Sequence, residues 1–305
     1  MFRNLRRRLT RGHESSRDRG LNVYGVTDTG KVRGHNEDSI LALGGEQSPP
    51  GVDALLVVAD GMGGHAAGEV ASGMAVSHIA ERFGPGEFAS VAVDGLEDAL
   101  QTLLQDVNSS VHSAGQDSDK HGMGTTCTLV VIKDKQLHYA HVGDSRAYLF
   151  RDGELTQITS DHSWVEEMVS LGSLTREQAR VHPNRNVITR AIGLDIEVQV
   201  DTGTQALRDG DLVLLCSDGL NSMIDDEEIA GILDYSSSDD ALAALIKAAN
   251  DAGGHDNTSV VIGAYGQRDS RMDEITTQPI TQETIKRGSD RPVLKRIWHI
   301  IFKLT

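Results

Sequence analysis

The sequence predicts an α+β fold, a layered sandwich in which β-strands form the centre and helices cover it. Short apolar segments rich in β-branched residues recur along residues 20–266 and are joined as hairpins. Segments with apolar residues at helical spacing come as two consecutive pairs, whereas a parallel α/β sheet would alternate single helices with strands. The 305 residues are 38% hydrophobic, which is enough for a sizeable core.

The first half of the chain predicts three strands followed by two helices. Residues 21–43 contain two short strands around a glycine-containing turn, and residues 52–60 form an apolar run typical of a buried strand. Residues 65–83 fit helical spacing in part. Residues 96–111 fit it throughout, with apolar side chains at Leu96, Leu100, Leu103, Val107 and Val111.

The second half predicts a hairpin, an irregular excursion and a second pair of helices between two strands. The hairpin covers residues 123–150, and Gly143 and Asp144 interrupt its second strand. Residues 155–193 are polar and mixed, so we expect short helices outside the sheet. The remaining strand, two helices and last strand are expected at residues 211–220, 225–233, 239–252 and 257–265.

The charge is distributed unevenly along the chain. The formal net charge is -16, but residues 1–19 carry seven Arg against Glu14 and Asp18. Residues 286–305 carry six Lys or Arg against Asp290. Since each end is +5, the residues between them carry -26. Such an acidic core excludes nucleic acid as a partner, and it would need cations to handle a phosphate group.

The two basic ends are predicted to lie outside the domain formed by residues 20–266. Residues 1–19 form a basic extension, residues 267–291 are polar and Thr-rich and resemble a linker, and residues 292–305 predict a basic amphipathic helix. That helix either docks on the rest of the protein or contacts an anionic membrane surface. The sequence leaves both alternatives open.

Cysteine usage and hydropathy predict the compartment. Cys127 and Cys216 lie inside apolar runs, as free cysteines do in a reducing environment. No apolar stretch is long enough to cross a bilayer, and the basic N-terminus lacks the apolar region of a signal peptide. We therefore expect a cytoplasmic protein, with peripheral membrane contact through the basic ends as a further hypothesis.

Acidic residues stand at the edges of four apolar runs. They are Asp60, Asp144, Asp218 and Asp256, and Glu37 and Asp38 form a fifth acidic cluster. Each one alone is typical of an ordinary turn at the end of a strand. Strands of one sheet bring their ends together, however, and several uncompensated carboxylates there would repel one another.

Cations are the expected compensation for these carboxylates. Only two basic side chains, Arg33 and Arg146, lie within the acidic motifs. The candidate ligands are carboxylates, with no cysteine and no paired histidines among them. Such an all-oxygen set favours Mg²⁺ or Mn²⁺ over Zn²⁺.

Eight motifs follow one another along residues 20–266: RGHNED, VVADGMGGHAAGE, GMGTTCTL, HVGDSRAYLFRDG, LTQITSDHSW, HPNRNVITRAIG, LLCSDGL and GGHDNTSVV. In order and spacing they resemble the protein phosphatase 2C family, in its bacterial branch of metal-dependent serine/threonine phosphatases. The resemblance implies a four-layer αββα sandwich, in which helix pairs flank two antiparallel sheets and a binuclear metal centre lies at one end.

The resemblance also implies which residues hold the metal ions. Asp60 would bridge both ions, and the Gly61 carbonyl would complete the first site. Asp218 and Asp256 would bind the second ion. Asp144 together with Asp218 matches a third, weaker site of the bacterial members.

The same resemblance assigns the remaining catalytic positions. Glu37 and Asp38 match residues that hold metal-bound waters, and Arg33 matches the side chain that binds the substrate phosphate. Eukaryotic members have a histidine, proposed as the general acid, where this chain has Met62. A metal-bound water is then the expected proton donor to the leaving oxygen.

Two histidines and one tryptophan in or near these motifs each have a structural and a functional interpretation. His65 and His162 lie in or near these motifs, but a histidine at a helix start or in a loop is more often a capping or surface residue than an acid catalyst. The region that corresponds to the family's flap, residues 160–190, contains Trp164, for which local packing is favoured over substrate contact.

The implied activity is hydrolysis of phosphoserine and phosphothreonine on proteins by a hydroxide that bridges two Mn²⁺ or Mg²⁺ ions. The implied partners are phosphorylated proteins and a cognate serine/threonine kinase, and we expect a monomer. The alternative is a catalytically silent regulatory domain of the same fold. That alternative predicts lost metal ligands, whereas the four aspartates are present. A metal-dependent nuclease is disfavoured because no basic groove is evident.

Overall fold

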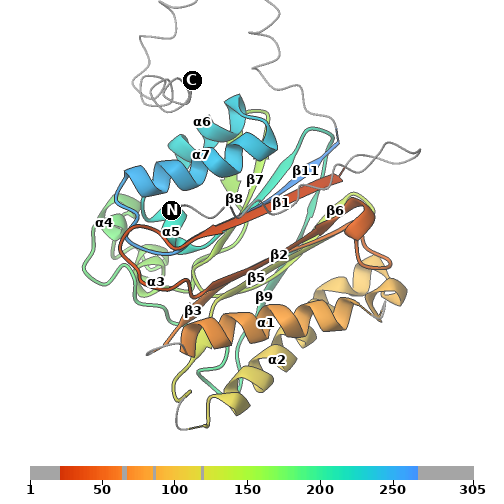
Figure 1. Cartoon of the computed structure of the whole chain (residues 1–305), viewed down its shortest axis with the longest axis horizontal. Coiled ribbons are helices and arrows are strands. Elements are labelled where there is room, and N and C mark those ends of the chain that lie inside the picture. Colours follow the sequence, from red (N-terminus) through yellow and green to blue (C-terminus); the bar gives the residue numbers. More distant parts are fainter. Residues whose placement is uncertain (1–20, 64–66, 85–86, 118–119, 267–305) are drawn as a thin grey trace, which may run out of the picture.

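Two antiparallel β-sheets form the centre of the molecule (Figure 1). The structure, a computed structural model, describes residues 21–63, 67–84, 87–117 and 120–266. The first sheet holds, in spatial order, β1 (Leu21–Asp28), β11 (Thr258–Tyr265), β10 (Leu212–Cys216), β7 (Arg146–Arg151) and β8 (Glu154–Gln157). The second holds β2 (Asp38–Gly44), β3 (Ala54–Met62), β5 (Cys127–Lys133), β6 (Gln136–Val142) and β9 (Asp201–Ala206), with the short β4 (Gly124–Thr125) paired to β3.

Helix pairs cover the outer faces of both sheets, which confirms the predicted four-layer αββα sandwich (Figure 1). The second sheet is covered by α1 (Ala67–Phe83) and α2 (Leu96–Ala114). The first is covered by α6 (Asp226–Tyr235) and α7 (Ser238–Asp251). Shorter helices gather at one end of the sandwich: α3 (Trp164–Ser170), α4 (Arg176–Arg180) and α5 (Asp218–Asn221). Three 3₁₀ turns lie at Gly45–Gln47, Glu87–Ser90 and Val93–Gly95.

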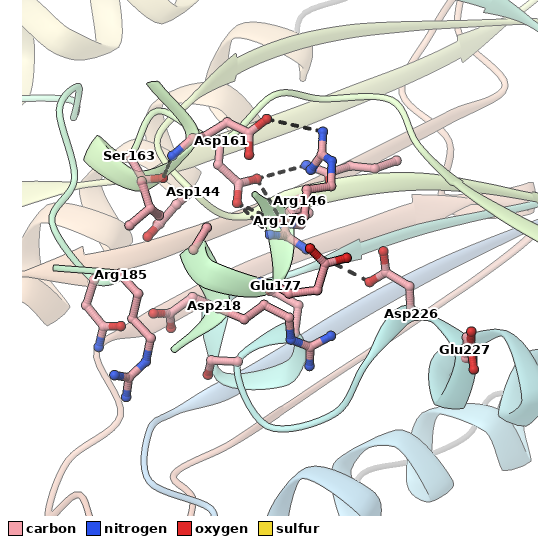
Figure 2. Close-up of a pocket in the computed structure, with 18 residues that line it drawn as sticks. Asp144, Arg146, Asp161, Ser163, Arg176, Glu177, Arg185, Asp218, Asp226 and Glu227 are labelled. Carbon is pink, nitrogen blue, oxygen red and sulfur yellow. Dashed lines mark hydrogen bonds and ion pairs between the residues drawn. The ribbon is translucent and has the colours of Figure 1, made fainter. Parts of the chain in front are cut away.

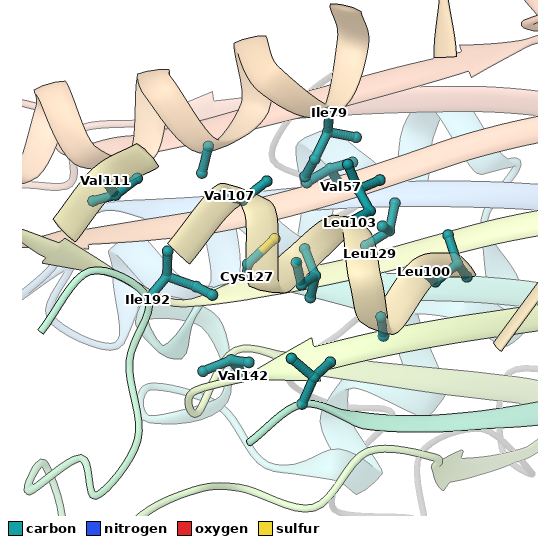
Figure 3. Packing of buried hydrophobic residues seen from close by; sticks show 14 of the residues in the cluster. Val57, Ile79, Leu100, Leu103, Val107, Val111, Cys127, Leu129, Val142 and Ile192 are labelled. Atoms are coloured by element: carbon teal, nitrogen blue, oxygen red, sulfur yellow. The ribbon is translucent and has the colours of Figure 1, made fainter. Parts of the chain in front are cut away.

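Alternation along the buried strands divides the core into three layers. Leu55 and Val57 of β3 pack against α1 and α2, beside Ile79 and Leu103 (Figure 3). Leu56, between them, faces the other sheet. Since successive side chains of a strand point to opposite faces, an all-apolar strand can fill two core layers at once. Because such strands are packed on both faces, the residues at their ends are held in fixed positions.

The predicted hairpin at residues 123–150 is correct only in its first half. β5 and β6 pair as expected, but β6 and β7 belong to different sheets. Gly143 lies at the crossing with φ +116°, and a Cβ there would approach Thr126 to 2.5 Å. The interruption predicted at Gly143 and Asp144 is thus the crossover between the two sheets.

Strands β8 and β9 were not expected from the sequence. Both are edge strands, and both are short and partly exposed. The DTGTQA sequence of β9 lacks an apolar alternation, so its strand geometry follows from pairing with β6.

The predictions for the basic extension 1–19, the linker 267–291 and the helix 292–305 lie outside the described residues, as does His65. Among the helices that the structure describes, none combines the length and apolar character needed to span a membrane.

Candidate metal centre

Strand pairing brings the first two acidic residues together. Asp38 and Asp60 stand opposite each other in the β2–β3 register. Asp38 is buried, and its Oδ2 accepts hydrogen bonds from Ser217 Oγ at 2.8 Å and Ser259 Oγ at 2.6 Å. Because Ser217 immediately precedes Asp218, these bonds join the acidic ends of both sheets. The predicted gathering of carboxylates is therefore present in the fold.

The backbone of Asp60 is fixed by two threonines. Its N–H donates to Thr126 Oγ1 at 2.9 Å, and its carbonyl accepts from Thr126 N at 2.8 Å and from Thr125 Oγ1 at 2.9 Å. Burial raises the pKa of the Asp60 carboxyl well above its usual range, and the carboxylates of Asp38 and Asp218 add to the rise. Asp60 thus lies at the centre of a field of like charge.

Several of these carboxylates have an oxygen without a partner. The buried Oδ1 atoms of Asp38, Asp144 and Asp218 have no hydrogen-bond partner among the described residues. Burial raises the pKa of Asp38 to about 6, and burial together with the Asp161 carboxylate raises the pKa of Asp144 to about 7. Unpaired buried oxygens of this kind are costly without a cation.

This donor set fits a hard divalent cation. The side chains of Asp38 and Asp218 each reach that of Asp60, and all the unpartnered atoms of these three aspartates and Asp144 are carboxylate oxygens. Within the described ranges, no group of three or more His, Cys, Asp or Glu side chains is arranged so that it could hold a metal ion. The aspartates nevertheless share one acidic region, in which Mg²⁺ or Mn²⁺ would supply the missing positive charge.

The loop that carries Arg33 is attached to the last ligand-bearing motif. Asn257 Nδ2 donates to the carbonyls of Thr29 and His35, both at 2.9 Å, and its Oδ1 accepts from Glu37 N at 2.9 Å. Asn257 was not among the residues predicted for the site. Its position beside Asp256 in the GGHDN motif was the available signal.

Arg33 lies beside a predicted metal ligand. Its Nη2 donates to Asp256 Oδ2 at 2.7 Å, while 48% of its side chain remains exposed. Glu37 is nearby, and burial raises the pKa of its carboxyl. Arg33, the side chain predicted to bind phosphate, thus lies at the same end of the sandwich as the predicted metal ligands.

Two glycines allow β3 and α1 to approach each other closely. A Cβ on Gly61 would come within 2.2 Å of the Gly68 carbonyl oxygen and 2.5 Å of the Glu37 carbonyl oxygen. A Cβ on Gly68 would come within 2.8 Å of Glu37 Oε1 and of the Gly61 carbonyl. Gly61 was predicted as a site residue, and Gly68 was not. The role of the Gly61 carbonyl as a ligand stays a prediction.

A cavity of about 540 Å³ extends from the acidic region to the flap (Figure 2). Asp144 and Asp218 line one part of it, and Arg176 and Arg185 line the flap side. Trp164 packs against His182 with ring centroids 4.8 Å apart, in keeping with the favoured packing role. Of the predicted site residues, Asp144 and Asp218 line this cavity, and Arg33, Asp60 and Asp256 are not among its lining residues.

The expectation that His162 is a capping or surface residue was wrong. Only 2% of His162 is exposed, and its ring lies 4.7 Å from the ring of His141, centroid to centroid. Ser163, the next residue, is the N-cap of α3, and its side chain accepts a hydrogen bond from Glu166 N.

Comparisons with known proteins agree with this geometry. A model of the family described as "Protein phosphatase 2C" matches residues 34–257. Protein phosphatase PhpP of Streptococcus pneumoniae is 39% identical over 249 residues, which cover 80% of this chain and 98% of that protein. Serine/threonine phosphatase stp of Listeria innocua is 38% identical over 238 residues, covering 77% and 92%.

Solved structures share the whole described fold. The serine/threonine phosphatase of S. agalactiae is 37% identical with a TM-score of 0.75, over 80% of this chain and 99% of that one. The catalytic domain of the serine/threonine phosphatase PstP, solved with two manganese ions, is 36% identical with a TM-score of 0.70, over 81% and 99%. This chain therefore belongs to the bacterial branch of the protein phosphatase 2C family, the metal-dependent serine/threonine protein phosphatases.

Proposed function

We propose that the acidic region binds two divalent cations, Mn²⁺ or Mg²⁺, and that the chain uses them to hydrolyse phosphoserine and phosphothreonine on proteins. Asp60 would be the shared ligand, the Gly61 carbonyl would serve the first ion, and Asp218 and Asp256 would serve the second. Asp144 with Asp218 would provide a third, weaker site. The observation that carries the proposal is the set of buried carboxylate oxygens without partners at the meeting point of both sheets.

The protein's own residues bind and orient the phosphate. Bound cations would supply Lewis-acid activation of the attacking water and neutralise phosphate charge. The Arg33 guanidinium can bind two phosphate oxygens at once, since it is a planar fork with several donors of which one is engaged by Asp256. Glu37 and the buried Asp38 would accept hydrogen bonds from waters around bound cations.

The chemistry of the site also points to the partners. Phosphorylated proteins are the substrates, and a serine/threonine kinase that phosphorylates the same proteins is the opposing enzyme. We place this exchange in the cytoplasm. The cavity beside the acidic region is lined by flap residues such as Arg176 and Arg185, which could contact the phosphorylated segment of a substrate.

The test compares two aspartates of one strand region. Asp60→Asn should abolish Mn²⁺-dependent hydrolysis of a phosphothreonine peptide, because it removes the shared ligand. Asp53→Asn is the matched control: Asp53 is exposed and stands immediately before the same strand, at the opposite end. Its activity should equal that of the wild type. Retained turnover in Asp60→Asn would contradict the proposed function, and so would wild-type protein that is inactive with every divalent cation.

The basic ends motivate a separate proposal about location. Six Lys or Arg in residues 286–305 and seven Arg in residues 1–19 would attract an anionic membrane surface, at about 1 kcal/mol for each basic residue near the lipid. Sedimentation with vesicles containing phosphatidylserine should carry the full chain down at low salt. Lys295→Glu with Arg296→Glu should reduce that fraction. Equal sedimentation of both proteins would reject membrane contact in favour of docking.

A further inference from the structure

The flap leaves the sandwich through a narrow neck that contains His162. Its backbone carbonyl accepts from Thr189 N at 2.8 Å, which ties the two ends of residues 160–190 together. Ser163 and Ile188 form an isolated β-bridge next to this bond. The side chain of His162 is 1% exposed, so its ring points into the protein.

The His162 ring connects this neck to the Asp144 turn. Gly143 N–H donates to His162 Nδ1 at 3.0 Å, and His162 N–H donates back to the Gly143 carbonyl at 2.7 Å. On its other side, His162 Nε2 lies 3.1 Å from Asp201 Oδ2. Asp201 is itself fixed, because its Oδ1 accepts from Arg190 Nη1 at 2.7 Å. One ring therefore joins the flap, the crossover turn and β9.

The partners of the ring define its tautomer. A backbone N–H can only donate, so His162 Nδ1, which faces Gly143 N–H, carries no proton. Nε2 then carries the proton and donates it to the Asp201 carboxylate. Burial lowers the pKa of His162, in agreement with a neutral ring.

The turn that His162 holds has few other constraints. Gly143 has φ +116° and lies between two strands of different sheets, outside both ladders. On the far side of Asp144, Ser145 is held by Thr126 Oγ1 at 2.8 Å and by Thr128 Oγ1 at 3.1 Å. The backbone on either side of Asp144 is thus fixed by side chains: Thr126 and Thr128 hold Ser145, and His162 holds Gly143.

We propose that His162 is a positioning residue whose Nε2–H tautomer fixes the Gly143 turn, and thereby aims the Asp144 carboxyl at a cation while tying it to the flap. This inference rests on the proposed function, because it takes Asp144 as a metal ligand. A residue that orients a metal ligand without touching the metal changes metal affinity about 10- to 100-fold when it is replaced.

Two substitutions separate the two bonds of the ring. In His162→Asn, Oδ1 occupies the position of Nδ1 and can accept from Gly143 N–H, but the side chain does not reach Asp201. In His162→Gln, the amide nitrogen can reach Asp201, but no acceptor remains for Gly143. Mn²⁺ binding to the full chain is measured from the electron paramagnetic resonance signal of free Mn²⁺. Circular dichroism and thermal melting verify that each variant is folded.

The expected result is asymmetric. His162→Gln should weaken the weakest Mn²⁺ site about tenfold, whereas His162→Asn should stay within about threefold of the wild type. The tighter Mn²⁺ sites should keep their affinity in both variants. Wild-type Mn²⁺ binding in both variants, or equal weakening in both, would overturn the inference.

Two further measurements keep the outcomes distinct. If Asp144→Asn binds Mn²⁺ as the wild type does, the assignment of the metal site itself has failed. If Asp144→Asn loses the weakest ion while His162→Gln keeps it, only the role of His162 has failed. In the wild-type protein, ¹⁵N NMR of the ring should show a bare Nδ1 and a protonated Nε2. A protonated Nδ1 would overturn the inference without any variant.

Discussion

At the scale of single residues, Arg33 should control the binding of phosphate. Arg33→Ala removes the exposed planar cation next to Asp256, so we expect KM for a phosphothreonine peptide to rise about tenfold, which corresponds to a loss of about 1.4 kcal/mol in binding. The inhibition constant of inorganic phosphate should rise in parallel, because the same side chain would bind it. Steady-state kinetics with saturating Mn²⁺ measures both constants.

Lys31→Ala is the matched control for that experiment. Lys31 is an exposed cation on the same loop, and its nearest described charge is Asp251 at 3.8 Å. Its removal lowers the local positive charge by the same amount without touching Asp256. An equal rise of KM in both variants would show that general charge attraction binds the phosphate, against a specific role for Arg33.

The acidic residues of the site could be predicted from the sequence, but most of their supports could not. Asp60, Asp144 and Asp218 stand at strand ends, where polar residues are easily noticed. Asn257 and His162 act through partners 222 and 19 positions away, namely His35 and Gly143. Hydrogen bonds of this range depend on how elements pack, so no local pattern announces them.

At the scale of elements, the approach of α1 to β3 should depend on Gly68. Alanine normally stabilises a helix by about 1 kcal/mol relative to glycine, but at Gly68 a Cβ would come within 2.8 Å of the Gly61 backbone. We expect Gly68→Ala to lower the free energy of unfolding by about 1–2 kcal/mol, since overpacking of a tight contact costs that much. Urea denaturation measures the difference.

The same helix contains its own control. Gly73 also lies in α1, and a Cβ there would have Ser39 Oγ at 4.0 Å as its nearest neighbour. Gly73→Ala should therefore raise the free energy of unfolding by about 0.5–1 kcal/mol. Destabilisation by both substitutions would mean that α1 tolerates no added methyl, and the contact between Gly68 and Gly61 would not be special.

Element types were easier to predict than element partners. The runs at β3, β10 and β11 are mostly apolar, and the structure confirms them as buried strands. The link between β6 and β7 was misassigned to one hairpin, because a crossover between two stacked sheets and a bulge in one strand both need a glycine and a polar residue. Only the second sheet, which the local sequence does not contain, distinguishes them.

At the scale of the whole molecule, the fold brings together acidic residues that are far apart in the sequence. The start of β2 and the end of β3 in one sheet lie beside the end of β10 in the other, and Asp38, Asp60 and Asp218 stand at these three places. Asp38 and Asp218 raise the pKa of Asp60, and Asp38 raises the pKa of Asp218, in addition to the effect of burial. The site therefore lowers the stability of the folded protein, as functional sites commonly do.

Metal binding should recover this stability. A cation that binds only the folded protein adds about 2.7 kcal/mol at a concentration 100 times its dissociation constant. We expect Mn²⁺ to raise the melting temperature of the wild type and a chelator to lower it, as measured by differential scanning calorimetry. Asp60→Asn should lose most of the Mn²⁺ effect, because the shared ligand is gone.

The chelated proteins provide the sharper comparison. Without cations, Asp60 is a carboxylate surrounded by carboxylates, so Asp60→Asn removes repulsion and should melt at a higher temperature than the wild type, with a gain of about 1 kcal/mol or more. Asp53→Asn, at the exposed start of the strand, should change neither melting temperature nor metal response. If Asp60→Asn is less stable than the wild type in chelator, the Asp60 carboxyl itself stabilises the fold. Repulsion between uncompensated carboxylates would then not be what destabilises the acidic region.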